Sequence, residues 1–345
     1  MSYSTIDNPE LYFQCKTYTG TGSSQAITLD GDENMQPDFV WIKVRSESNN
    51  HELYDVVRGV TKRIYSDISN AEDTNTAGLT AFGTDGFTVN TGGAVNGSSK
   101  TYVSWNWKAG GSGSANNDGS INTTSTSANS TSGISISKFT ATGSAATIGH
   151  GMSAIPKMIW VKRTDSSGSW QVYHASLGAT KYLELQNNQE VYANSGRWND
   201  TAPTSSVFSI AGEFVSSAVY ISYAFAEKTG YCKIGSYQGN GNADGPMLFM
   251  GQKPAWIMVK KTSASGDSWT ILDNKRDTFN VSKARLFPDQ NAAESTSTDV
   301  GDFVSNGFKI RTTAGTWNDD GGTYVFMAFA ESPFVNSNGV PNNAR

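Results

Sequence analysis

The clearest pattern along the chain is a short apolar run that begins at a proline and closes on a lysine. It occurs three times, at residues 37–43, 156–162 and 254–260. Runs of four or five apolar residues between turn-forming residues are typical of strands that are buried on both faces. No stretch keeps a 3.6-residue apolar period over three helical turns, so the pattern predicts an all-β chain.

These runs belong to an internal repeat of five blocks in constant order. Each copy has an opening aromatic residue with small neighbours, the Pro-to-Lys run, a short third block, a phenylalanine block and a closing block with two aromatics five residues apart. The openings are Tyr18, Phe139 and Tyr237; the third blocks begin at His51, Trp170 and Trp269; the fourth centre on Phe87, Phe208 and Phe308; the closing blocks begin at Tyr102, Tyr220 and Tyr324. Such self-similarity is the signature of a repeat protein.

Strands at short spacing with turn dipeptides between them predict one β-sandwich, jelly-roll-like, for each copy. The sequence therefore predicts three tandem homologous β-sandwich domains. The expected boundaries are an N-terminal arm at 1–14, repeat 1 at 15–108, a linker at 109–133, repeat 2 at 134–228, repeat 3 at 229–333 and a C-terminal tail at 334–345.

The linker at 109–133 is rich in Gly, Ser, Thr and Asn and has no aromatic residue. Such a composition buries too little apolar surface to form a core of its own. Two interpretations stay open, a flexible linker or a segment that lies over a neighbouring surface. The second junction, at residues 227–231, is much shorter. We therefore expect repeats 2 and 3 to be held rigidly and repeat 1 to be freer to reorient.

Composition and charge narrow the function classes. The formal net charge of the 345 residues is −5, which argues against binding nucleic acid through phosphate neutralisation. No apolar stretch is long enough to span a membrane, and residues 1–9 lack the features of a signal peptide. The two cysteines, Cys15 and Cys232, are too few for a disulfide framework. We expect synthesis in a reducing cytoplasm and, for a role outside the cell, release by lysis.

Two tryptophans outside the repeated blocks are the candidate binding residues. Each is followed by Asn and Asp in a loop context, in the segments Trp198-Asn199-Asp200 and Trp317-Asn318-Asp319. A sugar ring can stack on an indole while Asn and Asp bind its hydroxyl groups, so these residues are candidate glycan contacts. The alternative is that each tryptophan covers the core of its own sandwich.

Catalytic and metal-binding signals are weak. No nucleophile elbow, phosphate-binding loop or zinc motif occurs, and no carboxylate pair recurs in all three copies, so no enzymatic activity and no cofactor are expected. Asp319 and Asp320 are the weak candidates for a Ca²⁺ site. The repeated Lys43, Lys162 and Lys260 are interpreted as strand-end residues with the ammonium group in water or paired with an acid, rather than as a binding set.

A family resemblance rests on several ordered segments. They are Pro37-Asp-Phe-Val-Trp-Ile-Lys43, Arg58-Gly-Val-Thr-Lys62, Asp85-Gly-Phe87, Trp107-Lys-Ala-Gly-Gly111, Asp273-Asn-Lys-Arg-Asp277 and Ala328-Phe-Ala-Glu-Ser-Pro-Phe334. With these segments the chain resembles repeat-containing virion proteins of tailed bacteriophages, especially marine ones. Such proteins are usually labelled tail fibre or uncharacterised structural protein, some with concanavalin-like sandwich domains. The resemblance implies a virion component present in several copies, and it implies no catalytic residues.

Three functions follow as hypotheses. The first is a non-enzymatic tail-fibre or tail-associated adhesin that contacts host surface glycans, with avidity from a homo-oligomer. The second is a capsid decoration or head-fibre protein bound on the phage head. The third, a polysaccharide depolymerase, is the least favoured because no carboxylate pair recurs in all three copies. The expected partners are other virion proteins and, for the adhesin, host surface polysaccharide, with no nucleic acid and no membrane insertion.

Overall fold

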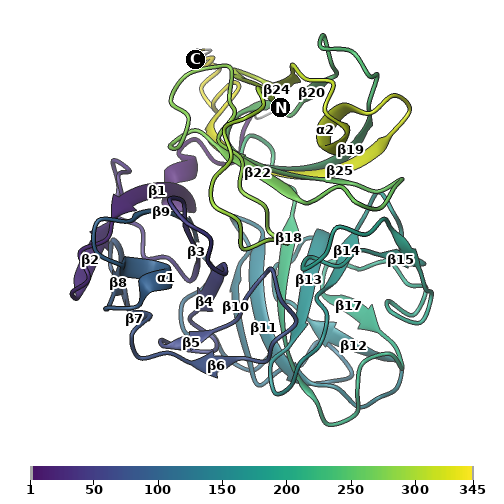
Figure 1. The fold of residues 1–345 in the computed structure, drawn as a ribbon. Coiled ribbons are helices and arrows are strands. Elements are labelled where there is room, and N and C mark those ends of the chain that lie inside the picture. The colour runs from purple at the N-terminus through teal and green to yellow at the C-terminus, as the bar shows by residue number, and fades with distance from the viewer. Residues whose placement is uncertain (1–2, 344–345) are drawn as a thin grey trace.

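The computed structural model describes residues 3–343. Its architecture is all-β, which confirms the predicted fold class: the sheets are antiparallel and the helices are single turns. The strands fall into three groups that follow the three repeats, and Figure 1 shows these groups arranged around a common centre. Each group has an inner sheet, which faces that centre, and a smaller outer sheet.

Repeat 1 has an inner sheet in the order β1-β9-β3-β4, an outer sheet β2-β8-β7 and a pair β5-β6, which adjoins β4 through the backbone bridge of Leu53 and Ile64. Its elements are η1 (Pro9–Leu11), β1 (Phe13–Thr19), β2 (Gln25–Thr28), β3 (Phe39–Val44), β4 (Glu52–Asp55), β5 (Lys62–Arg63), β6 (Asp73–Thr74), β7 (Leu79–Gly83), β8 (Gly86–Val89), α1 (Gly93–Asn96) and β9 (Thr101–Trp107).

Repeat 2 has a five-stranded inner sheet in the order β10-β11-β18-β13-β14 and an outer pair β12-β17. A second pair, β15-β16, adjoins β14 through the backbone bridge of Val172 and Leu183. Its strands are β10 (Ser125–Asn129), β11 (Ile134–Thr140), β12 (Ala146–Gly149), β13 (Pro156–Arg163), β14 (Gln171–His174), β15 (Lys181–Tyr182), β16 (Tyr192–Ala193), β17 (Val207–Ile210) and β18 (Val219–Ala226).

Repeat 3 returns to the pattern of repeat 1, with an inner sheet β19-β25-β21-β22 and an outer sheet β20-β24-β23. Its elements are β19 (Cys232–Gln238), β20 (Met247–Phe249), β21 (Gln252–Lys261), β22 (Thr270–Asp273), β23 (Gly301–Val304), β24 (Gly307–Ile310), α2 (Gly315–Asn318) and β25 (Thr323–Pro333).

Each inner sheet is buried on both faces, which explains the continuous apolar runs in the sequence. Along β3, Phe39 and Trp41 belong to a core shared by all three repeats, whereas Val40 and Ile42 belong to the core of repeat 1 alone. Successive side chains of a strand point to opposite faces, so a strand between two cores must be apolar at every position.

The shared core joins the repeats into one body. Trp41 and Trp160, from repeats 1 and 2, lie with ring centroids 5.8 Å apart, and Trp105 and Trp256, from repeats 1 and 3, lie 6.3 Å apart. Separations in this range are typical of attractive aromatic pairs. Repeat 1 takes part in this core as fully as the others, so the expectation that it reorients freely is wrong.

The segment at 109–133 is not a flexible linker in this structure. Its strand β10 pairs with β11 along five residues, and the N–H of Ser114 and the carbonyl of Thr126 add a further rung at 3.1 Å. The segment therefore corresponds to the second interpretation, a chain lying over a neighbouring surface. The sequence did not predict this strand because its side chains are mostly polar. A strand at the edge of a sheet can be held by backbone hydrogen bonds without an apolar face.

The glycine before the phenylalanine block also has a structural reason. A Cβ atom on Gly86 would lie 1.9 Å from the carbonyl oxygen of Ile27, and one on Gly307 would lie 1.9 Å from that of Leu248. Gly86 also has a positive φ of 113°, where other residues are strained. The neighbouring outer strand can therefore approach only because these two positions lack a side chain.

Candidate functional site

The two candidate glycan-stacking tryptophans are buried, which corrects the sequence interpretation. Trp198 lies in the core of repeat 2, beside Tyr173, and Trp317 lies in the core of repeat 3, beside Phe308. Their exposed fractions are 1% and 0%. A ring without exposed surface cannot stack on a sugar, so both side chains follow the alternative interpretation of a core residue.

The polar neighbours of these tryptophans do not form one site. Asn318 is fully buried and its amide donates to the carbonyl oxygens of Thr312, at 2.7 Å, and Asn242, at 2.6 Å. It therefore ties the turn after β19 to the turn around α2. Asp319 pairs with Lys261 at 2.9 Å. Asn199 and Asp200 are exposed, whereas Trp198 beside them lies in the core of repeat 2. Both exposed residues have positive φ angles.

The weak calcium candidates gain no support from geometry. Asp319 and Asp320 are both exposed, and Asp319 has a lysine as its close partner. Within residues 3–343, no three His, Cys, Asp or Glu side chains gather as a metal site would require.

The three repeated lysines are buried, contrary to the expectation that their ammonium groups lie in water or pair with an acid. Each ammonium donates to backbone carbonyl oxygens, and two of them reach the neighbouring repeat: Lys43 to Asn291 at 3.4 Å and Lys162 to Ser69 at 3.1 Å. Lys260 donates within its own repeat, to Asp267 at 2.9 Å. Burial lowers the pKa of each lysine to about 8.

A pH dependence of stability follows from these lysines. The folded-state pKa of Lys162 lies below its ordinary value of 10.5, so the cost of its buried charge is present below about pH 8 and is relieved as pH rises. We expect wild type to gain about 1 kcal/mol over Lys162→Met between pH 7 and pH 9. Urea unfolding of both proteins measures this difference, in which the titration of other groups cancels. A difference that stays constant with pH would contradict the lowered pKa.

A buried ionic network lies at the interface of repeats 1 and 2. Asp55 pairs with Arg58 at 2.5 Å, and the Tyr223 hydroxyl of repeat 2 donates to the same carboxylate at 2.6 Å. Arg58 also reaches Glu72 at 3.4 Å. The side chains of Asp55 and Arg58 have no exposed surface. Neither charge contacts water, so removing one of them would leave the other buried without its counter-charge.

The interface of repeats 1 and 3 contains the same network on equivalent residues. Asp273 pairs with Arg276 at 2.5 Å and accepts a hydrogen bond from the Trp105 indole of repeat 1 at 2.9 Å. Arg276 continues to Glu294 at 3.1 Å. An aromatic donor of one repeat thus contacts an Asp–Arg–Glu set of the next in both cases.

The interface of repeats 2 and 3 departs from this pattern at all four positions, which hold His174, Leu177, Val191 and Met327. Leu177 and Val191 pack against the shared core, to which Met327 belongs. His174 Nε2 lies 3.4 Å from the carbonyl oxygen of Phe326, and burial lowers the pKa of this histidine to about 4. These four positions are therefore uncharged at neutral pH, and the ion pair of this interface lies elsewhere, between Glu227 of repeat 2 and Lys233 of repeat 3 at 2.9 Å.

Sequence reasoning missed these interface residues, although a signal was present. Asp55 and Arg58 follow the third block of repeat 1 with the spacing of Asp273 and Arg276 in repeat 3. An Asp-x-x-Arg pair at the same place in two copies, and absent from the other, marks positions where the repeats differ in their contacts.

A groove lies beside the interface of repeats 2 and 3. It has a volume of about 490 Å³. Its wall consists of Ser176 and Leu177 of repeat 2, residues of β19 and β25 in repeat 3, and Thr262, which follows β21. The polar groups of its wall are hydroxyls and an amide, from Ser176, Ser236, Gln238, Thr262 and Thr323. None of its lining residues is charged.

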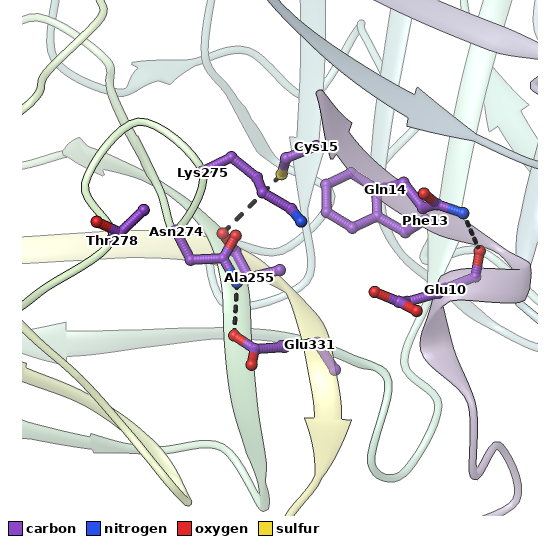
Figure 2. Close-up of a pocket in the computed structure, with 10 residues that line it drawn as sticks. Glu10, Phe13, Gln14, Cys15, Ala255, Asn274, Lys275, Thr278 and Glu331 are labelled. Atoms are coloured by element: carbon purple, nitrogen blue, oxygen red, sulfur yellow. Dashed lines mark hydrogen bonds between the residues drawn. The ribbon is translucent and has the colours of Figure 1, made fainter. Parts of the chain in front are cut away.

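A second hollow, shown in Figure 2, lies between repeats 1 and 3 and measures about 220 Å³. Its wall contains the charged residues Glu10, Lys275 and Glu331 and the thiol of Cys15. Burial raises the pKa of this thiol well above its usual value. The thiol therefore stays protonated at neutral pH, which is the opposite of what a nucleophilic cysteine needs.

Four exposed apolar side chains lie on the outside of repeat 3, at the two edges of its outer sheet. We call Met247 and Phe249 on β20, with Phe279 and Val281 in the loop beside β23, the repeat-3 patch. Phe279 is 82% exposed and Phe249 is 64% exposed. The loop with Phe279 is fixed by Asn280, which exchanges hydrogen bonds of 2.9 and 3.0 Å with the backbone of Phe303 in β23. The patch is thus carried on the two edges of the outer sheet of repeat 3.

Comparison with known proteins gives a family and no function. The model of a family described as a domain of unknown function, DUF7483, matches residues 8–333. No curated protein matches the chain, and no solved structure does. Within residues 3–343, no helix has the length and apolar character that crossing a membrane requires.

Proposed function

The chain belongs to the DUF7483 family, and from that premise we propose that it is a non-enzymatic structural protein of a bacteriophage particle. The resemblance of its repeats to virion proteins of tailed phages supports this role. The proposal gives the chain no catalytic centre and no cofactor.

The shared core supports a structural role. Three repeats that bury tryptophans against one another cannot move as separate binding heads, because displacing one repeat exposes the core of the other two. Close packing of this kind makes a stiff body. A stiff body of three fused repeats suits a component that is bound on a particle surface.

The repeat-3 patch is the observation that carries the proposal. Among residues 3–343, nine large apolar side chains are exposed, and four of them make up this patch. The equivalent outward positions in the other repeats hold Ala26 and Thr28 on β2, and Thr147 and Gly149 on β12. Exposed aromatic residues of this kind are typical anchors of protein interfaces. We infer that repeat 3 attaches the protein to another virion protein.

Two positions on the virion follow from the sequence, the tail and the head. Attachment through repeat 3 favours a decoration protein on the phage head. The tail adhesin, which is the first hypothesis from the sequence, becomes the second candidate because its proposed aromatic contacts, Trp198 and Trp317, are buried. Electron microscopy of intact virions carrying a gold-labelled antibody against the protein tests the address. Label over the head is the expected result. Label on the tail would favour the adhesin, and virions without label would overturn the structural role.

The repeat-3 patch makes its own prediction. We expect Phe249→Ser combined with Phe279→Ser to reduce the protein bound per virion by about tenfold or more, because each ring is a candidate anchor. The unfolding temperature should not fall, since both rings are already in water. Quantitative immunoblots of purified virions measure the bound protein.

Val215→Ser is the matched control, because Val215 is an exposed apolar residue on repeat 2. It should leave incorporation unchanged. Equal incorporation of the double variant and wild type would show that the patch is not the attachment surface.

A further inference from the structure

The first long strand of each repeat occupies equivalent positions in the three inner sheets, and only one of the three is covered by a further strand. These strands are β1, β11 and β19. In repeat 2, β10 lies on the outer side of β11 with Ser125 opposite Lys138 and Asn129 opposite Ile134. In repeats 1 and 3, β1 and β19 are the last strands of their sheets.

The register of β19 shows which backbone groups its free edge presents. Gly239 donates to Gly322 of the β25 side at 2.8 Å, and Ala330 of β25 donates to Tyr231 at 2.8 Å. In an antiparallel pair, hydrogen-bonded residues alternate with residues that turn their N–H and C=O to the other side. Ser236 and Gln238 therefore direct their backbone groups away from β25.

These groups are available over only part of the strand. At the start of β19, the turn at residues 228–231 pairs with Cys232, and Glu227 Oε1 accepts from the N–H of Ile234 at 3.1 Å. Beyond that point, the backbone N–H and C=O of Ser236 and Gln238 have no protein partner within residues 3–343. Both residues are exposed.

In repeat 2, the backbone carbonyl equivalent to that of Ser236 does have a hydrogen-bond partner. Lys138 aligns with Ser236, because Phe139 and Tyr237 are the opening aromatics of their repeats. The carbonyl of Lys138 accepts from the N–H of Thr124 at 2.8 Å. The chain therefore already contains one example of a strand added to this edge.

The uncharged groove lies directly beside the free edge of β19, since Ser236 and Gln238 both line it. Its neutral hydroxyl and amide groups match the residues of β10, which are Ser, Thr, Ser, Ala and Asn. The edge of β1 is different, because the hollow beside it is smaller and contains charged residues. The two free edges thus differ in the peptide that they would accept.

We propose that the free edge of β19 binds an extended, uncharged segment of a partner polypeptide, rich in Ser, Thr and Ala, as a fifth antiparallel strand. Its backbone pairs with Ser236 and Gln238, and its side chains enter the groove between repeats 2 and 3. Backbone pairing supplies affinity in such strand addition, and the adjoining pocket supplies selectivity.

A peptide with the sequence of residues 123–130 tests this site on the full chain. We expect saturable binding and at least tenfold slower amide hydrogen exchange at Ser236 and Gln238. Ser236→Pro should weaken binding at least tenfold without lowering the unfolding temperature, because the lost N–H faces solvent and not the ladder. Thr17→Pro is the matched control at the equivalent position of β1 and should bind the peptide as wild type does.

A change in the peptide tests the same point without altering the protein. N-methylation of the peptide amides that would face β19 should abolish binding, since it blocks backbone pairing. Wild-type protein without exchange protection, or peptide binding that survives both Ser236→Pro and N-methylation, would overturn strand addition. Saturable binding of a neutral oligosaccharide in the groove, with no peptide binding, would overturn it in favour of a sugar site.

Discussion

Arg58→Leu is expected to lower the free energy of unfolding by about 3–5 kcal/mol, the usual effect of removing one partner of a buried ion pair. The substitution leaves the carboxylate of Asp55 buried, with the Tyr223 hydroxyl as its remaining partner from the other repeat. Urea unfolding at neutral pH measures the loss. Arg311→Leu is the surface control, because Arg311 is 45% exposed, and it should cost less than about 1 kcal/mol.

The third interface of the same molecule supplies the compensating residues. The combined substitution of Asp55→His, Arg58→Leu, Glu72→Val and Tyr223→Met installs the set that repeats 2 and 3 use. Because this set buries no charge, we expect the quadruple variant to be more stable than Arg58→Leu alone and to recover at least half of the loss. If the quadruple variant instead loses the sum of the stability losses of the four single variants, the apolar set is stabilising only in its own place between repeats 2 and 3.

The inner strands could be predicted from the sequence because their signal is local. Continuous apolar runs such as Phe39 to Ile42 predict a strand that is buried on both faces. The structure confirms this, because the strand lies between two cores. The repeat made the same prediction available three times. The runs do not predict that one of the two cores is shared by all three repeats, because that depends on contacts between residues far apart in the sequence.

The environment of the lysines and tryptophans could not be predicted, because it is set by distant residues. The ammonium groups of Lys43 and Lys162 each donate to a carbonyl group of another repeat, at Asn291 and Ser69, in addition to carbonyl groups of their own repeat. Similarly, a Trp-Asn-Asp segment has the same sequence whether the ring points into a core or into solvent. Strand β10 was hidden for a related reason, since its partner rather than its own composition holds it in place.

The candidate interface network shows how far repeat comparison can go. Aligning the three copies identifies Asp55 and Asp273 as equivalent and His174 as different. The alignment alone does not say that an aromatic side chain of another repeat donates to each aspartate, because that contact crosses between repeats. The physical meaning of the difference therefore needed the structure.

Trp317→Ala is expected to lower the free energy of unfolding by about 3–5 kcal/mol, the usual cost of truncating a buried aromatic residue. The ring fills the core of repeat 3 beside Phe308, and α2 cannot move inward because Asn318 fixes its end. Val95 occupies the equivalent place before Asn96 in α1 of repeat 1. Trp317→Val should therefore cost less than Trp317→Ala, which urea unfolding of both variants measures.

The same variants separate packing from glycan binding. If Trp317 acts only in the core, polysaccharide binding per folded molecule should be equal for wild type and Trp317→Ala, and the same should hold for Trp198→Ala. Asp320→Ala is the control for the exposed turn and should change stability by less than about 0.5 kcal/mol. Loss of binding at unchanged stability would contradict the buried position of the ring. Loss of stability at unchanged binding would assign the tryptophan to the core and leave any host contact to other surfaces.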